Sequence, residues 1–273
     1  MGRYVEVEKN VSLYVEDIGE GQPIVLIHGW PLSQQTFEYQ LNELPKHARV
    51  VAIDLRGHGK SDCPIDGYTY DRMADDIRAV IDALDLNNIV LAGFSMGGPI
   101  AVRYMTRYAG YRVEKLVLMA AAAPVFTQRV DYPYGMKKAE VDELIQQIEA
   151  DRPLALAGFG KKFFNSDISK PFSNWFQQIA LSASSYGTIQ AAVSLRDEDL
   201  RIELPAIQVP TLIMHGKKDQ ICPFEFALEM GELLPNAKLI PFENSGHGLF
   251  YDEKEEFNNQ LVQFIQSNRT IAF

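Results

Sequence analysis

Residues 87–98 read NNIVLAGFSMGG, a short apolar run that passes directly into a glycine-rich turn holding one serine, Ser95. A continuous apolar run of this length is typical of a strand buried on both faces. The segment from Gly97 to Tyr108 is predicted to be helical, so Ser95 stands where a strand gives way to a helix. Small residues at Gly93 and Gly97 permit a turn tight enough to lift the serine hydroxyl clear of the sheet. The simpler interpretation is a glycine-rich turn in which serine only caps the helix.

Segments of the same kind lie on both sides of this junction and alternate with helical patterns. Strands that are apolar throughout and alternate with helices predict a mostly parallel, doubly wound sheet covered on both faces. An antiparallel hairpin is predicted at the amino terminus, from RYVEVE and SLYVED. The buried strands are predicted at PIVLIH, RVVAID, NNIVLA, EKLVLMA, TLIMHG and AKLIPF. The helices are predicted at 35–45, 69–86, 97–108, 224–234 and 252–267.

This rhythm is interrupted in the middle of the chain. Between Pro124 and Leu204 the sequence has helical and aromatic segments but no convincing strand. We therefore expect a core domain formed by residues 1–124 and 205–273, with residues 125–204 inserted as a helical cap.

Composition limits the classes of function. The formal net charge of −10 argues against nucleic acid or an anionic membrane as the main partner, because phosphate binding needs clustered Lys and Arg. The two cysteines are too few for a disulfide framework, and no metal or cofactor motif (HExxH, GxGxxG or P-loop) is present. No signal-peptide pattern or membrane-span run is found, so we expect a cytoplasmic protein that needs neither metal nor cofactor.

A serine at such a turn is a weak nucleophile unless a base activates it. Ligands of an open parallel sheet bind beyond the carboxyl ends of its strands. His247 follows the last predicted strand in ENSGHGLF, where the neighbours Gly246 and Gly248 give an imidazole room to move. We therefore predict that His247 is the base for Ser95. The other histidines are His28, His47, His58 and His215.

The acid that orients this histidine is expected at another strand end, ahead of His247 in the chain. Asp219 meets both conditions, because it follows TLIMHG in HGKKDQICP. Its rivals are Asp197, Asp199 and Glu243: the first two fall in the insertion and the third lies within the loop of His247 itself. The amide of Met96, at the start of the helix after Ser95, is predicted to bind a developing oxyanion.

The order Ser95, Asp219, His247 resembles that of the α/β-hydrolases. HGWP, DLRGHGKSD, GFSMGG, HGKKDQICPFE and SGHG all fall in the order of that superfamily. Within it the chain most resembles the bacterial arylesterases and cofactor-free haloperoxidases, or perhydrolases, through APVF, DYPYG and DQICPFE. The resemblance implies the α/β-hydrolase fold, a mostly parallel doubly wound sheet with a helical cap insertion.

Several residue roles follow from the resemblance. The amide of Trp30 would be the second oxyanion donor, and Pro31 is associated with perhydrolysis. Phe94, Phe126 and Ile221 are expected to contribute to the substrate pocket. Other cap aromatics that could line it are Phe159, Phe163, Phe164, Trp175 and Phe176.

The sequence therefore predicts a serine carboxylic-ester hydrolase that acts through an acyl-enzyme on small esters, with perhydrolase or haloperoxidase side activity. Hydrolases of carbon–carbon bonds, lactones or lactams share these residues and remain open. So does a slow-turnover receptor for a small ligand. The expected partner is a small-molecule ester, and relatives that form dimers, trimers or hexamers make a homo-oligomer an option.

Overall fold

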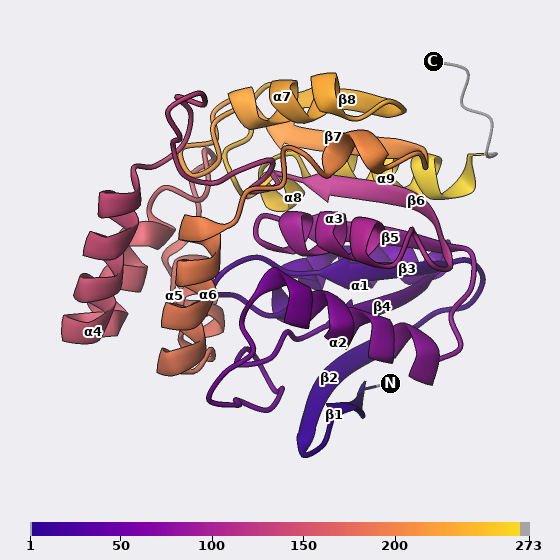
Figure 1. Cartoon of the computed structure of the whole chain (residues 1–273), viewed down its shortest axis with the longest axis horizontal. Coiled ribbons are helices and arrows are strands. Elements are labelled where there is room, and N and C mark those ends of the chain that lie inside the picture. Colours follow the sequence, from indigo (N-terminus) through magenta and orange to yellow (C-terminus); the bar gives the residue numbers. More distant parts are fainter. Residues whose placement is uncertain (1, 268–273) are drawn as a thin grey trace.

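The computed structural model describes residues 2–267, and in that range eight strands form one sheet (Figure 1). They are β1 (Gly2–Glu8), β2 (Val11–Ile18), β3 (Pro23–Ile27), β4 (Arg49–Ile53), β5 (Ile89–Phe94), β6 (Val113–Met119), β7 (Thr211–Gly216) and β8 (Ala237–Phe242). Their spatial order is β1-β2-β4-β3-β5-β6-β7-β8. The first hairpin is antiparallel, β2 pairs antiparallel with β4, and every later pairing is parallel. The predicted hairpin and the mostly parallel sheet are confirmed.

Burial explains why the central strands lack alternation. Every residue of β3, β5 and β7 is buried, because helices cover both faces of the sheet. Strand β8 lies at the edge and is only partly buried.

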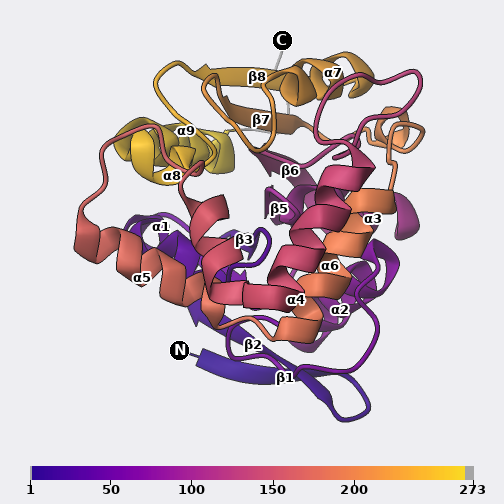
Figure 2. The same cartoon turned by 90° about the vertical axis from the view of Figure 1, so that its left-hand side faces the viewer.

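The helices of the core form one layer on each face of the sheet. In Figure 2, α2, α3 and α7 lie on one side of the sheet, while α1, α8 and α9 lie on the other. Their bounds are α1 (Glu38–Glu43), α2 (Tyr70–Ala83), α3 (Gly97–Arg107), α7 (Glu225–Leu233), α8 (Leu249–Asp252) and α9 (Lys254–Gln266). Among the described residues, none of the helices is long and apolar enough to cross a membrane.

One predicted core helix differs from the observed structure. The segment predicted as one helix over 35–45 is η1 (Gln34–Phe37), a short α1 and η2 (Leu44–Lys46), with Pro45 in the last of these. Local turn geometry there interrupts the apolar periodicity on which the prediction depended. The helix predicted over 252–267 is confirmed as α9, and the short α8 precedes it.

The helices of the insertion lie beyond the carboxyl ends of the parallel strands, on the left of Figure 1. They are α4 (Lys138–Gly160), α5 (Lys170–Leu181) and α6 (Ser185–Asp197); the short η3 (Leu204–Ala206) follows. Helix α4 is broken at Asp151, whose backbone is extended (φ −153°, ψ 84°). The Asp151 carboxylate accepts the amide of Leu154 at 3.1 Å and so caps a second helical segment that carries Pro153 in its first turn.

Candidate active site

Ser95 occupies a strained turn between β5 and α3. Its φ is +51°, in the left-handed region that a residue with a side chain rarely adopts. The turn is fixed by its backbone, because the Ser95 amide donates to the carbonyl of Met119 at 2.9 Å and the Ser95 carbonyl accepts from Ala122 at 3.0 Å. A Cβ on Gly93 would lie 2.2 Å from the carbonyl oxygen of Gly97. The close approach predicted for these two glycines is therefore present.

Asp219 and His247 are hydrogen-bonded to each other. Both side chains are almost fully buried, and Nδ1 of His247 lies 2.7 Å from Oδ2 of Asp219. The other carboxylate oxygen, Oδ1, accepts the backbone amides of Ile221 at 2.8 Å and Cys222 at 2.9 Å. The carboxylate is thus held from both sides, and Nδ1–H of His247 donates to it. That tautomer leaves Nε2 of the imidazole as a proton acceptor.

A second imidazole packs behind the carboxylate. Nε2 of His215 donates to the Cys222 carbonyl at 2.8 Å and lies 3.5 Å from Oδ2 of Asp219. Burial lowers the pKa of His215 and raises that of the Cys222 thiol. Both groups are therefore neutral, and position 222 supports the site through its backbone.

The rival acids have other partners. Asp197 pairs with Arg196 and Lys138, and Asp199 pairs with Arg201. Glu243 pairs with Lys217 at 2.7 Å. Among the described residues, Asp219 is the carboxylate that contacts His247.

Two aromatic rings enclose the His247 imidazole. The ring of Phe94, the residue directly before Ser95, lies 5.0 Å from it, and the ring of Phe163 lies 4.8 Å from it. Phe94 is fully buried and also contacts Phe37 and Phe250. Its neighbours place it in the core beside His247, and it is not among the residues that line the pocket at Ser95.

His28 holds the peptide bond that carries the Trp30 amide. The amide of Leu55 donates to Nε2 of His28 at 3.0 Å, so the proton of this imidazole is on Nδ1, which donates to the Gly29 carbonyl at 2.9 Å. Burial lowers the pKa of His28 to about 3, so it remains neutral. The Gly29 carbonyl and the Trp30 N–H belong to one peptide unit, and the bond from His28 therefore fixes the direction of that N–H.

Two buried backbone N–H groups, those of Trp30 and Met96, have the free donor that an oxyanion site needs. Trp30 and Met96 are 4% and 0% exposed, and within residues 2–267 neither backbone N–H donates a hydrogen bond to another group. Buried amides are almost always paired, so such a pair is available to a ligand oxygen. The Trp30 indole is anchored separately, because Nε1 donates to the Thr188 carbonyl of α6 at 2.8 Å.

The pocket at Ser95 is small. Its volume is about 20 Å³, far below the several hundred Å³ of a typical small-molecule site. Phe126 and Ile221 line this pocket, whereas Pro31 lines a neighbouring cleft between α4 and α5. The pocket is lined by Trp30, Ser95, Phe126, Met136, Val141, Leu144, Phe159, Ala192, Leu195 and Ile221.

Most of the cap residues that line this pocket are not predicted from the sequence. Val141 and Leu144 share one face of α4, at a helical spacing that is visible in the sequence. That spacing marks a buried face without indicating which pocket it faces. Of the cap aromatics, Phe159 lines the Ser95 pocket, while Phe163 packs on His247.

Comparison with known proteins identifies the family of this chain. The model of the alpha/beta hydrolase family matches residues 24–260. The chain belongs to the α/β-hydrolase family. This α/β-hydrolase is 56% identical to the AB hydrolase superfamily protein YisY of Bacillus subtilis (strain 168), over 98% of the chain and 100% of that protein. It is 33% identical to the bifunctional esterase/perhydrolase DCH of Acinetobacter calcoaceticus, over 97% and 99% of the two chains.

A solved structure agrees with these matches. The esterase EaEST from Exiguobacterium antarcticum superposes on the α/β-hydrolase with a TM-score of 0.96 and 53% identity, over 98% of this chain and 100% of that one. The family and fold predicted from the sequence are confirmed, and two of these three relatives carry an esterase or an esterase/perhydrolase name.

Proposed function

We propose that this α/β-hydrolase is a serine carboxylesterase that cleaves small esters through an acyl-enzyme. The observation that carries the proposal is the buried hydrogen bond of 2.7 Å between Asp219 and His247, which lie at the ends of β7 and β8. The strained turn of Ser95, at the end of β5, supports it. These three side chains in this chain order are the elements of a serine-hydrolase triad.

In the first half of the reaction, Ser95 Oγ attacks the ester carbonyl carbon and its proton passes to Nε2 of His247. The new oxyanion accepts hydrogen bonds from the amides of Trp30 and Met96. The carbon–oxygen bond to the alcohol then breaks, and the alcohol leaves with the proton from His247. Asp219 holds the imidazole in the correct tautomer and stabilises its charged form. An ester of Ser95 remains.

In the second half, water attacks the acyl carbon and gives a proton to His247. The bond from that carbon to Ser95 Oγ then breaks, Oγ takes the proton back from His247, and the acid leaves. Hydrogen peroxide in place of water would give a peracid by the same steps. Pro31 directly after the oxyanion donor Trp30, and the esterase/perhydrolase name of the Acinetobacter relative, favour this second activity.

The test is hydrolysis of p-nitrophenyl acetate, butyrate and octanoate by the wild-type chain and by Ser95→Ala. The substitution should lower kcat by a factor on the order of 10³–10⁶, because it removes the nucleophile. The control is Ser182→Ala, which removes a serine hydroxyl at the end of α5 that donates to the Ile179 carbonyl at 2.6 Å; it should leave kcat unchanged. A Ser95→Ala protein that keeps most of its activity, or a wild-type protein that gives a single burst without turnover, would overturn the proposal.

A further inference from the structure

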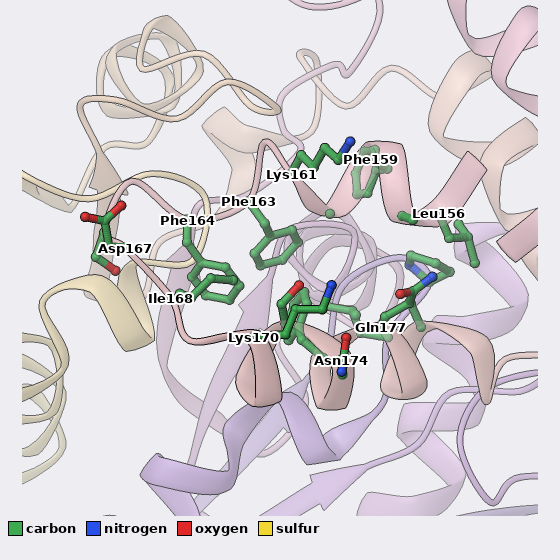
Figure 3. Close-up of a pocket in the computed structure, with 18 residues that line it drawn as sticks. Leu156, Phe159, Lys161, Phe163, Phe164, Asp167, Ile168, Lys170, Asn174 and Gln177 are labelled. Carbon is green, nitrogen blue, oxygen red and sulfur yellow. The ribbon is translucent and has the colours of Figure 1, made fainter. Parts of the chain in front are cut away.

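Phe159, near the end of α4, borders three hollows of the molecule. The first is the pocket at Ser95, of about 20 Å³. The second is the α4–α5 cleft, of about 590 Å³, which Figure 3 shows with Phe159, Phe163 and Leu156 on one side and Lys170, Asn174 and Gln177 of α5 on the other. The third is a cleft of about 560 Å³ on another side of α4, which reaches Ile221. Of the residues that line these hollows, Phe159 is the one that all three share.

The pocket at Ser95 is too small for a long apolar half of an ester, such as an octanoyl chain. Its volume is about 20 Å³, so part of its wall must move when such a substrate binds. Three wall residues are partly exposed, namely Met136, Leu144 and Phe159, and the others are buried. Of these three, only Phe159 also lines the α4–α5 cleft.

The backbone at Phe159 suits a side chain that moves. Its neighbours are Gly158 and Gly160, and a Cβ at either position would meet no atom within 4 Å. The helical segment that carries them begins at the break at Asp151. The ring itself makes an edge contact with Trp30 at 5.1 Å, directly over the residue whose amide is assigned to the oxyanion site. Glycine on both sides lowers the cost of changing the local backbone.

We propose that Phe159 is a specificity-determining residue of the esterase. Its ring closes the Ser95 pocket towards the α4–α5 cleft, and its displacement joins the two into one binding site. The joined site takes esters with one long or bulky apolar half, which lies against Pro31, Leu32 and Phe163. A volume of about 590 Å³ is within the range of small-molecule sites. This inference rests on the proposed esterase function.

The test compares kcat/KM for p-nitrophenyl acetate and octanoate in the full chain, with Phe159→Ala and the milder Phe159→Leu. Removal of the ring should raise the octanoate-to-acetate ratio at least about tenfold, the scale on which apolar pocket contacts discriminate substrates. Phe172→Ala is the matched control: this ring lies in α5, packs on Tyr251 at 4.1 Å and lines neither hollow, so the ratio should stay unchanged. A thermal unfolding curve for each variant checks that the protein is folded.

An unchanged ratio in both Phe159 variants, with acetate still hydrolysed, would overturn the specificity role while leaving the esterase function intact. Absence of turnover in the wild-type chain would instead refute the esterase function. Displacement of the ring is tested by the double variant Gly158→Ala, Gly160→Ala, which fits the available space. It should raise or preserve the melting temperature and lower kcat/KM several-fold for octanoate but not for acetate. Equal kcat/KM for octanoate in the wild type and this variant would overturn the displacement.

Discussion

Replacing Asp219 by asparagine tests the proposed mechanism at one atom. Oδ1 of Asp219 faces two backbone amides, those of Ile221 and Cys222, whereas Oδ2 faces Nδ1 of His247. Asparagine keeps the shape but presents one oxygen and one NH₂ group. If the NH₂ took the position of Oδ1, it would face two other donors. The asparagine oxygen must therefore occupy that position, and the NH₂ group must face His247.

This orientation determines the tautomer of the histidine. An NH₂ donor beside Nδ1 of His247 requires an unprotonated Nδ1, so the proton moves to Nε2, the nitrogen that must accept the proton of Ser95. The base is lost while the geometry is kept. The expected loss of kcat for Asp219→Asn is about 10⁴-fold. At 1.36 kcal/mol per factor of ten this is about 5 kcal/mol of activation free energy.

The assay is steady-state hydrolysis of p-nitrophenyl acetate, with nitrogen-15 NMR of the histidine side chains as a second measurement. The NMR spectrum should show His247 protonated at Nδ1 in the wild type and at Nε2 in Asp219→Asn. Glu243→Gln is the matched control, because Glu243 pairs with Lys217 instead of His247. A folded Asp219→Asn protein with more than about a tenth of the wild-type kcat would refute the assignment of the acid.

Two further predictions concern stability. Burial lowers the pKa of His28 to about 3 and of His58 to about 4, below the ordinary 6.5. The unfolded chain therefore binds more protons below pH 6.5. The free energy of unfolding should fall as the pH drops from about 6.5 to about 3, by on the order of 3 to 5 kcal/mol for each imidazole. Urea unfolding that is flat from pH 7.5 to 5 would contradict this. Lys115, buried in β6, donates to the carbonyls of Phe264, Ile265 and Ser267 at the end of α9. Lys115→Met should therefore lower the free energy of unfolding by about 2–4 kcal/mol without changing kcat. Lys238→Met, on the exposed edge strand, should leave the free energy of unfolding unchanged in the same urea titration.

The sequence predicts the parts of the site that depend on strand ends. Ser95, Asp219 and His247 each follow a short apolar run, and parallel strands bring their carboxyl ends to one edge of a sheet. Apolar periodicity and chain order are therefore enough to predict that these loops meet. The hydrogen bond between Asp219 and His247 agrees with that prediction. The same hydrogen bond distinguishes Asp219 from the rival Glu243, which is nearer to His247 in the sequence.

The sequence does not predict features that depend on packing between distant segments. Phe94 precedes the serine, yet its side chain packs into the core and contacts Phe37 and Phe250, because successive residues of a strand point to opposite faces. The break of α4 at Asp151 is of another kind, because its cause is local: Asp151 caps the amide of Leu154, and Pro153 lies two residues further along the chain. Neither the small size of the Ser95 pocket nor the position of Phe159 at its border follows from periodicity.

Three histidines around the site have different roles because their hydrogen bonds differ. His28 receives a proton donor on Nε2 and donates from Nδ1, so both nitrogens are occupied and the imidazole supports the peptide of the Trp30 amide. His215 donates from Nε2 to the Cys222 carbonyl, behind the carboxylate of Asp219. His247 has one occupied nitrogen, Nδ1, and keeps Nε2 for chemistry. A hydrogen bond to a carbonyl also polarises the N–H of the same peptide unit, so His28 strengthens the Trp30 amide as a donor. The buried, neutral imidazoles of His28 and His215 thus hold the peptide of the Trp30 amide and the carboxylate of Asp219 in place. In the proposed mechanism proton transfer falls to His247, which is hydrogen-bonded to Asp219 through Nδ1.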